Sequence, residues 1–183
     1  SGAFEFIEKP FDKDRLINFV NRAVENFRLK NENKNLQSRL FQSFELIGKS
    51  DNIDNFNISP GQETAVIKKY SNGRALELCH WGILPDWAKG KKGFRRLHNT
   101  RSESLTKPYF KKLISENRLL IPCSHFYEWS KSEENKKIPY CFKSEVNNEI
   151  MFFAGIFENN QFSIITREAT EKNSKIHHRQ PLI

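Results

Sequence analysis

The 183-residue chain contains few cysteines, and none lies in a pattern typical of a disulfide framework or a zinc site. The three cysteines, Cys79, Cys123 and Cys141, are odd in number and form no CxxC pair. No apolar run approaches the roughly 20 residues of a membrane-spanning helix, and the first residues do not resemble a signal peptide. We therefore expect a cytoplasmic protein without a metal or other cofactor.

Acidic residues are fewer than basic ones, and the imbalance is uneven along the chain. There are 30 Lys and Arg against 22 Asp and Glu, a formal net charge of +8. Residues 1–50 hold nine basic and seven acidic residues, which leaves 21 and 15 for residues 51–183. This surplus is what a phosphate-binding surface requires. A basic surface that only keeps the protein soluble is the alternative.

The first 50 residues have the pattern of a helical segment. Residues 3–7 read as a short strand, and the following Lys-Pro forces a turn. Asp12 can cap a helix whose apolar residues recur at helical spacing. These residues are Leu16, Val20, Val24 and Phe27, and Ala23 can share the stripe. We predict a boundary between residues 50 and 51.

Beyond residue 62 the pattern becomes alternating, which favours strands. Ser71-Asn72-Gly73 predicts a hairpin turn, with positive φ angles at Asn72 and Gly73. A helix is predicted to Glu116, capped by Thr106 and with Pro108 in its first turn. Further strands are predicted at 118–122, 125–129, 139–143, 150–157 and 162–166. The predicted fold is α+β, a mixed or antiparallel barrel-like β domain with few helices, preceded by a helical N-terminal segment.

Three separated blocks carry an amide, a carboxylate and an imidazole among arginines and tryptophans. They are HisAsnThrArgSerGlu at 98–103, HisPheTyrGluTrp at 125–129 and IleHisHisArgGlnPro at 176–181. Such sets are typical of a site for a charged, reactive substrate. We interpret Asn99, Glu128 and His177 as candidate catalytic residues that act on nucleic acid.

These blocks resemble the SOS response-associated peptidase (SRAP) family of abasic-site processing proteins, which crosslink to single-stranded DNA. The resemblance covers residues 56–183 and includes PheAsnIleSerProGlyGln at 56–62, TrpGlyIleLeuProAspTrpAlaLys at 81–89 and PheSerIleIleThr at 162–166. It implies a role in the SOS response to DNA damage, with abasic single-stranded DNA as the partner.

The resemblance also implies roles for individual residues. Glu128 matches the family's catalytic acid, His177 the histidine that assists ring opening and reversal, and Asn99 the asparagine that positions the substrate. Five further residues match positions that contact or lie near the DNA. They are Arg101 and Arg179, matching phosphate-binding arginines, and Trp81, Trp87 and Thr166.

The family's nucleophile is a cysteine directly after the initiator methionine, and this chain shows no such opening. It starts with Ser1, and no cysteine precedes Cys79. An imine-plus-thiol reaction needs an amine and a thiol on one N-terminal residue. We therefore expect a region truncated at both ends that binds DNA without a covalent bond or is inactive, which leaves its peptidase or lyase-type activity open.

Residues 1–50 resemble the end of an NtrX-type response-regulator receiver domain and its linker. Lys9-Pro10 matches the end of the last receiver strand, and GluLeuIleGlyLysSer at 45–50 matches the start of the ATPase domain that follows. The phosphoacceptor strands of a receiver are absent. Two alternatives follow: a two-component remnant that acts through its N-terminal helix, and a decayed gene product. Which half of the chain is ordered and binds a partner distinguishes the two-component remnant from the DNA-binding protein.

Overall fold

The computed structural model describes residues 57–131, 136–145 and 150–183, and eleven helical positions between Asp14 and Asn31. The chain divides into two compact units, Ser1–Phe44 and Glu45–Ile183. In the first unit Val20, Val24 and Phe27 are helical, as predicted, with 49%, 61% and 68% of their surfaces exposed. The predicted strand at 3–7, the Asp12 cap and Leu16 lie outside the described residues. The boundary at residue 50 stays a prediction.

The second unit is rich in strands and poor in helices. Its elements in chain order are β1 (Glu63–Tyr70), β2 (Gly73–Trp81), η1 (Asp86–Ala88), β3 (Asn99–Arg101), η2 (Ser102–Ser104), α2 (Pro108–Glu116), β4 (Arg118–Cys123), β5 (His125–Lys131), β6 (Lys137–Lys143), β7 (Met151–Glu158), β8 (Gln161–Glu168), α3 (Glu171–Ser174) and β9 (Arg179–Pro181). None of the helices among the described residues is long and apolar enough to cross a membrane.

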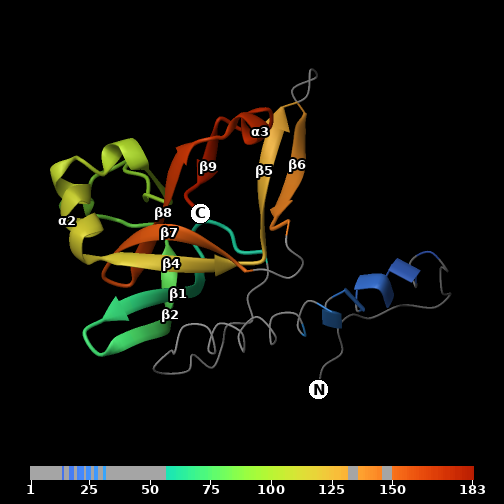
Figure 1. Ribbon diagram of the computed structural model, residues 1–183, viewed down its shortest axis with the longest axis horizontal. Helices are drawn as coiled ribbons and strands as arrows, with labels where there is room; N and C mark the ends of the chain where they lie inside the picture. The colour runs from blue at the N-terminus through green and yellow to red at the C-terminus, as the bar shows by residue number, and fades with distance from the viewer. Residues whose placement is uncertain are drawn as a thin grey trace. The chain divides into compact units, whose positions relative to one another are not determined.

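Seven strands form one mixed sheet in the order β2-β1-β4-β7-β8-β3, with β9 beside β8 (Figure 1). The sheet closes into a ring because β2, the first strand in this order, also pairs with β8. This pairing is parallel and covers His80↔Gln161 and Trp81↔Phe162. Because this closure is so short, the sheet is ring-like and not a regular barrel. The predicted α+β class, with many strands and few helices, is confirmed.

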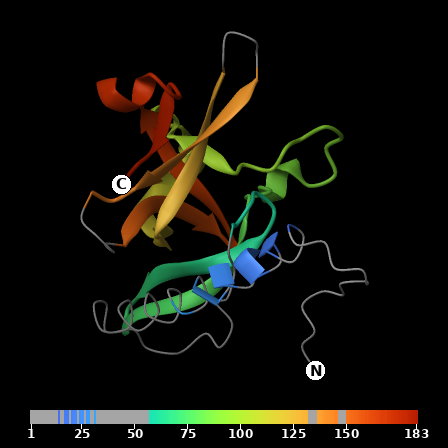
Figure 2. The same ribbon diagram turned by 90° about the vertical axis from the view of Figure 1, so that its right-hand side faces the viewer.

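β5 and β6 form a separate two-stranded ribbon. Figure 2 shows it as a twisted hairpin standing in front of the ring-like sheet. Stacked Phe126 and Phe142, with ring centroids 4.9 Å apart, join the two strands, and Phe126 also contacts Phe153 of the main sheet edge to face at 5.3 Å. The hairpin is thus anchored by aromatic packing at its base.

The predicted strands from 118 onward are confirmed as β4 to β8, and the predicted hairpin as β1 and β2. Two details were wrong. Lys107 is the N-cap of α2, and the Thr106 hydroxyl donates to the Glu103 carbonyl at 3.4 Å. In the hairpin turn Gly73 has φ +142°, whereas Asn72 is not in the positive-φ region. Periodicity missed β3, β9 and α3, which are too short to show it.

The sheet is covered on both faces, and β8 contributes to both cores. Phe162 and Ile164 pack in one cluster with residues of β1, β2, β4 and β7, and Ile165 packs in a second cluster that includes Leu113 of α2. Consecutive side chains of a strand point to opposite faces. This explains why β8 is buried without interruption from Phe162 to Thr166.

Gly155 of β7 lies where there is no room for a side chain. A Cβ atom there would lie 2.7 Å from the Cδ1 atoms of Ile121 and Leu119, and 3.0 Å from the Ser163 carbonyl oxygen. We predict that Gly155→Ala lowers the free energy of unfolding by about 1–3 kcal/mol through overpacking, as measured by urea denaturation.

Ile121→Val provides the control, because it removes one of the two Cδ1 atoms. Gly155→Ala should therefore cost less in the Ile121→Val background than in the wild type. An equal cost in both backgrounds would contradict this steric explanation.

Candidate functional site

Glu128 reaches the site because of strand alternation in β5. Phe126 and Glu128 share one face of the strand, whereas Tyr127 and Trp129 share the other. Phe126 packs against the core, and Tyr127 and Trp129 are 44% and 51% exposed. The Glu128 side chain therefore points inward and is 27% exposed.

His177 lies in the turn between α3 and β9, which a buried glutamine holds in shape. The Gln180 side-chain oxygen accepts hydrogen bonds from the Thr170 backbone N–H at 3.0 Å and from the Asn173 amide at 2.9 Å. The His177 backbone N–H donates to the Asn173 carbonyl at 3.1 Å. The turn thus has its own polar framework independent of any ligand.

Glu128 and His177 meet across these two elements. The His177 Nδ1 atom lies 3.8 Å from Glu128 Oε2. Burial raises the pKa of the Glu128 carboxyl, and the nearby imidazole of His177 partly opposes this effect. A carboxyl with a raised pKa beside an imidazole is an arrangement suited to general acid–base chemistry.

The contacts of Nδ1 indicate which nitrogen of neutral His177 carries the proton. Nδ1 lies 2.9 Å from the Arg179 carbonyl oxygen and 3.3 Å from the Arg179 backbone nitrogen. The carbonyl oxygen can only accept, so the first contact needs a proton on Nδ1, whereas the backbone N–H can donate only to an Nδ1 without a proton. The shorter distance favours the tautomer with the proton on Nδ1. Nε2 then keeps its lone pair and is the atom able to take a proton from a substrate.

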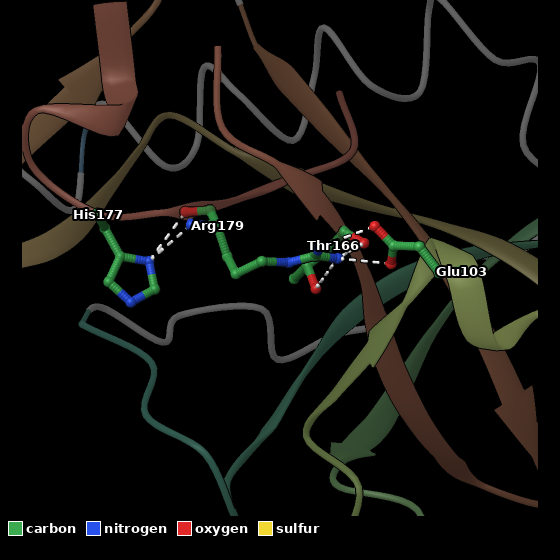
Figure 3. A network of polar contacts seen from close by, with 4 residues as sticks. All are labelled: Glu103, Thr166, His177 and Arg179. Atoms are coloured by element: carbon green, nitrogen blue, oxygen red, sulfur yellow. Dashed lines mark hydrogen bonds and ion pairs between the residues drawn. The ribbon is translucent and has the colours of Figure 1, made fainter. Parts of the chain in front are cut away.

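The Arg179 side chain is held by Glu103 and Thr166 (Figure 3). Its two terminal nitrogens donate to the two Glu103 carboxylate oxygens at 2.8 and 3.1 Å, and one of them also donates to the Thr166 carbonyl at 2.6 Å. The Arg179 guanidinium lowers the pKa of Glu103 to about 2. Glu103 is therefore a carboxylate at any physiological pH.

Asn99 and Arg101 lie on β3, which pairs in parallel with β8. Asn99 is beside Ile164 and Arg101 beside Thr166. Both side chains are exposed, and Thr100 between them is buried. They therefore share the solvent side of the strand. The structure brings Arg101 beside the Thr166 and Arg179 pair, whereas convergence of the Asn99 amide on Glu128 and His177 stays a prediction.

The two candidate tryptophans have different surroundings. Trp81 is partly buried, stacks on Phe162 at 6.2 Å, and donates its indole N–H to the His98 carbonyl at 2.8 Å. Trp87 in η1 is 53% exposed, and Lys91 Nζ lies 5.0 Å from its ring centroid. Trp87 has the freer face for a base, and DNA contact by either tryptophan stays a prediction.

The cysteines offer no activated thiol at this site. Burial raises the pKa of Cys79 and raises that of Cys123 to about 12, so both stay protonated. Cys141 on β6 is exposed. Within the part of the chain that the structure describes, no group of three or more His, Cys, Asp and Glu side chains could hold a metal ion.

Residue patterns did not single out Glu103 or Gln180. Glu103 stands within the 98–103 block, but its partner Arg179 is 76 residues away, and no periodicity connects them. Gln180 falls in the 176–181 block, where nothing distinguishes it from a surface glutamine. Only the pairing of β3 and β9 with β8 reveals their roles.

Comparison with known proteins links this geometry to a family. The abasic site processing protein YoqW of Bacillus subtilis is 32% identical over 164 residues, which cover 79% of this chain and 73% of YoqW. A crystal structure from Bordetella bronchiseptica shares the fold, with a TM-score of 0.65 at 18% identity over 80% of this chain and 79% of that one.

A second similarity is shorter. A response regulator of Rickettsia bellii, named NtrX-like, is 45% identical over 49 residues, or 27% of this chain and 10% of the regulator. By contrast, the sequence profile described as SOS response associated peptidase (SRAP) matches residues 26–183. With Glu128, His177 and Arg179 all inside the matched range, the chain belongs to the SOS response-associated peptidase (SRAP) family.

Proposed function

We propose that residues 57–183 bind single-stranded DNA at abasic sites, and that Glu128 and His177 move protons at the bound lesion. The observation that carries this proposal is the placement of the Glu128 carboxyl 3.8 Å from the His177 imidazole, with its pKa raised by burial. The similarity to abasic site processing proteins supplies the substrate class.

The chemistry of an abasic site calls for such a pair. The sugar exists partly as a ring-opened aldehyde, and an amine that attacks the carbonyl gives an imine and water. A neighbouring thiol can then add to the imine carbon and close a stable ring. Glu128 would protonate the leaving oxygen, and Nε2 of His177 would accept and return protons without forming the covalent bond itself.

Arg101 and Arg179 are not equally available to bind a phosphate. Arg101 is exposed on β3, so its guanidinium can meet a phosphate directly. Arg179 commits three of its five N–H donors to Glu103 and Thr166. In this proposal Arg101 is the main phosphate ligand of the site, and Arg179 contributes at most a terminal N–H.

Binding to single-stranded DNA should be sensitive to salt. Each lost phosphate contact changes the slope of log affinity against log salt by about 0.7 for single strands. We predict that Arg101→Ala weakens binding and flattens the slope by about that amount, as measured by fluorescence anisotropy at several salt concentrations. Arg74→Ala in the β1–β2 hairpin removes the same charge elsewhere and is the control. A flat slope for the wild type would refute the proposal.

The covalent step can be separated from binding. We expect the 183-residue polypeptide, which begins with Ser1, to give no heat-stable adduct with an abasic oligonucleotide on a denaturing gel. A chimera in which a CysGlyArgPhe opening replaces residues 1–50 supplies an amine and a thiol on one residue, and it should give the shifted band.

Within that chimera, Glu128→Gln should slow adduct formation by about 10²–10⁴-fold, the usual contribution of a positioned acid. A heat-stable band from the 183-residue polypeptide would refute the first expectation. A Glu128→Gln chimera that reacts at the rate of its parent would refute the role of Glu128.

The raised pKa of Glu128 also predicts a pH dependence of stability. Between its unfolded and folded pKa values the folded chain binds more protons than the unfolded chain, so the contribution of this group to stability falls as pH rises through that window. Glu128→Gln removes the charge and keeps the shape. We expect it to raise Tm relative to the wild type at pH 8, and to do so less at pH 4. Glu116→Gln on the exposed end of α2 is the control. Equal differences at both pH values would contradict the shift.

A further inference from the structure

Glu103 is the one member of the network in Figure 3 to which no role in proton transfer or DNA contact has been assigned. It lies in η2, directly after the β3 residues Asn99 and Arg101. Its two carboxylate oxygens accept hydrogen bonds from the two terminal nitrogens of Arg179 at 2.8 and 3.1 Å. Glu103 therefore links the segment that carries Asn99 to the segment that carries His177.

The backbone of Arg179 connects this side-chain contact to His177. In the favoured tautomer the Arg179 carbonyl accepts a hydrogen bond from His177 Nδ1–H at 2.9 Å. β9 begins at Arg179 and pairs with β8 over three residues, and the Ala169 N–H donates to the His178 carbonyl just before it at 3.0 Å. The side-chain contacts of Arg179 add to this backbone support. A shift of the Arg179 backbone would therefore also shift the imidazole of His177.

The side chain of Arg179 is oriented by its terminal nitrogens alone. It is 14% exposed, and its buried Nε atom has no hydrogen-bond partner among the described residues. A buried donor without a partner is unfavourable, so other contacts must hold the guanidinium in this orientation. The bidentate pair with Glu103, assisted by the Thr166 carbonyl, supplies those contacts.

We propose that Glu103 is a positioning residue for His177: by clamping the Arg179 side chain it fixes the Arg179 carbonyl, which keeps the proton on Nδ1 and leaves Nε2 to face the substrate. The significance for catalysis rests on the proposed role of His177 in proton transfer. The positioning itself is a property of the protein without DNA, so it can be tested separately.

The test is two-dimensional ¹H–¹⁵N NMR of the full chain labelled at histidine, at a pH where His177 is neutral. We expect the wild-type His177 signals to be those of the Nδ1–H tautomer. Glu103→Ala should shift the ratio toward the Nε2–H tautomer by about fivefold, the effect of one net hydrogen bond on an equilibrium. Glu103→Gln keeps one acceptor oxygen and should restore part of the wild-type ratio.

Glu116→Ala removes one exposed carboxylate from α2 and is the matched control, which should leave the His177 signals unchanged. A Glu103→Ala chain that is folded by circular dichroism but keeps the wild-type ratio would overturn the inference. If Glu103→Ala does not fold, Glu103→Gln becomes the test variant. A wild-type tautomer ratio in Glu103→Gln would equally overturn the inference. A shifted ratio in Glu103→Ala, together with a wild-type chain that does not bind abasic single-stranded DNA, would leave the positioning role intact and count against the proposed function alone.

Discussion

The backbone pairing of the C-terminal half of β8 is the constraint on which the site depends. On one edge β8 pairs in parallel with β3, and on the other it pairs antiparallel with β9. Thr166 therefore has Arg101 on one side and Pro181 on the other. The Arg179 side chain crosses this row to reach Glu103, which is 76 residues away in the chain. Without this pairing, Glu103 and Arg179 would not meet.

The surroundings of two glutamates at the site shift their pKa values in opposite directions. Glu128 lies on the inward face of β5, where loss of water raises its pKa in spite of the nearby His177. Glu103 is exposed and paired with Arg179, which lowers its pKa to about 2. The same type of side chain thus has a raised pKa in one place and is a permanent charge in the other. These opposite pKa shifts are set by the environment of each carboxyl and not by its residue type.

Much of the fold could be predicted from residue patterns, because long strands repeat every two residues. β1, β2 and β4 to β8 each have seven or more residues or a continuous apolar run, and their positions were predicted correctly. β3 and β9 have three residues each, too few for a period to show. The wrong cap at Thr106 has a similar cause, since a helix end depends on one local geometry and not on a repeat.

Residue types and their order determined the family, the α+β class and the candidates Asn99, Glu128 and His177. These follow from motifs and periodicity, which are local along the chain. The tertiary structure decided which candidates touch: Glu128 with His177, and Arg179 with Glu103. It also favours a proton on Nδ1 of His177, because that atom lies nearest to the Arg179 carbonyl. Distances across strands, loss of water and competition for donors arise only when distant segments pack, so no reading of the linear order could supply them.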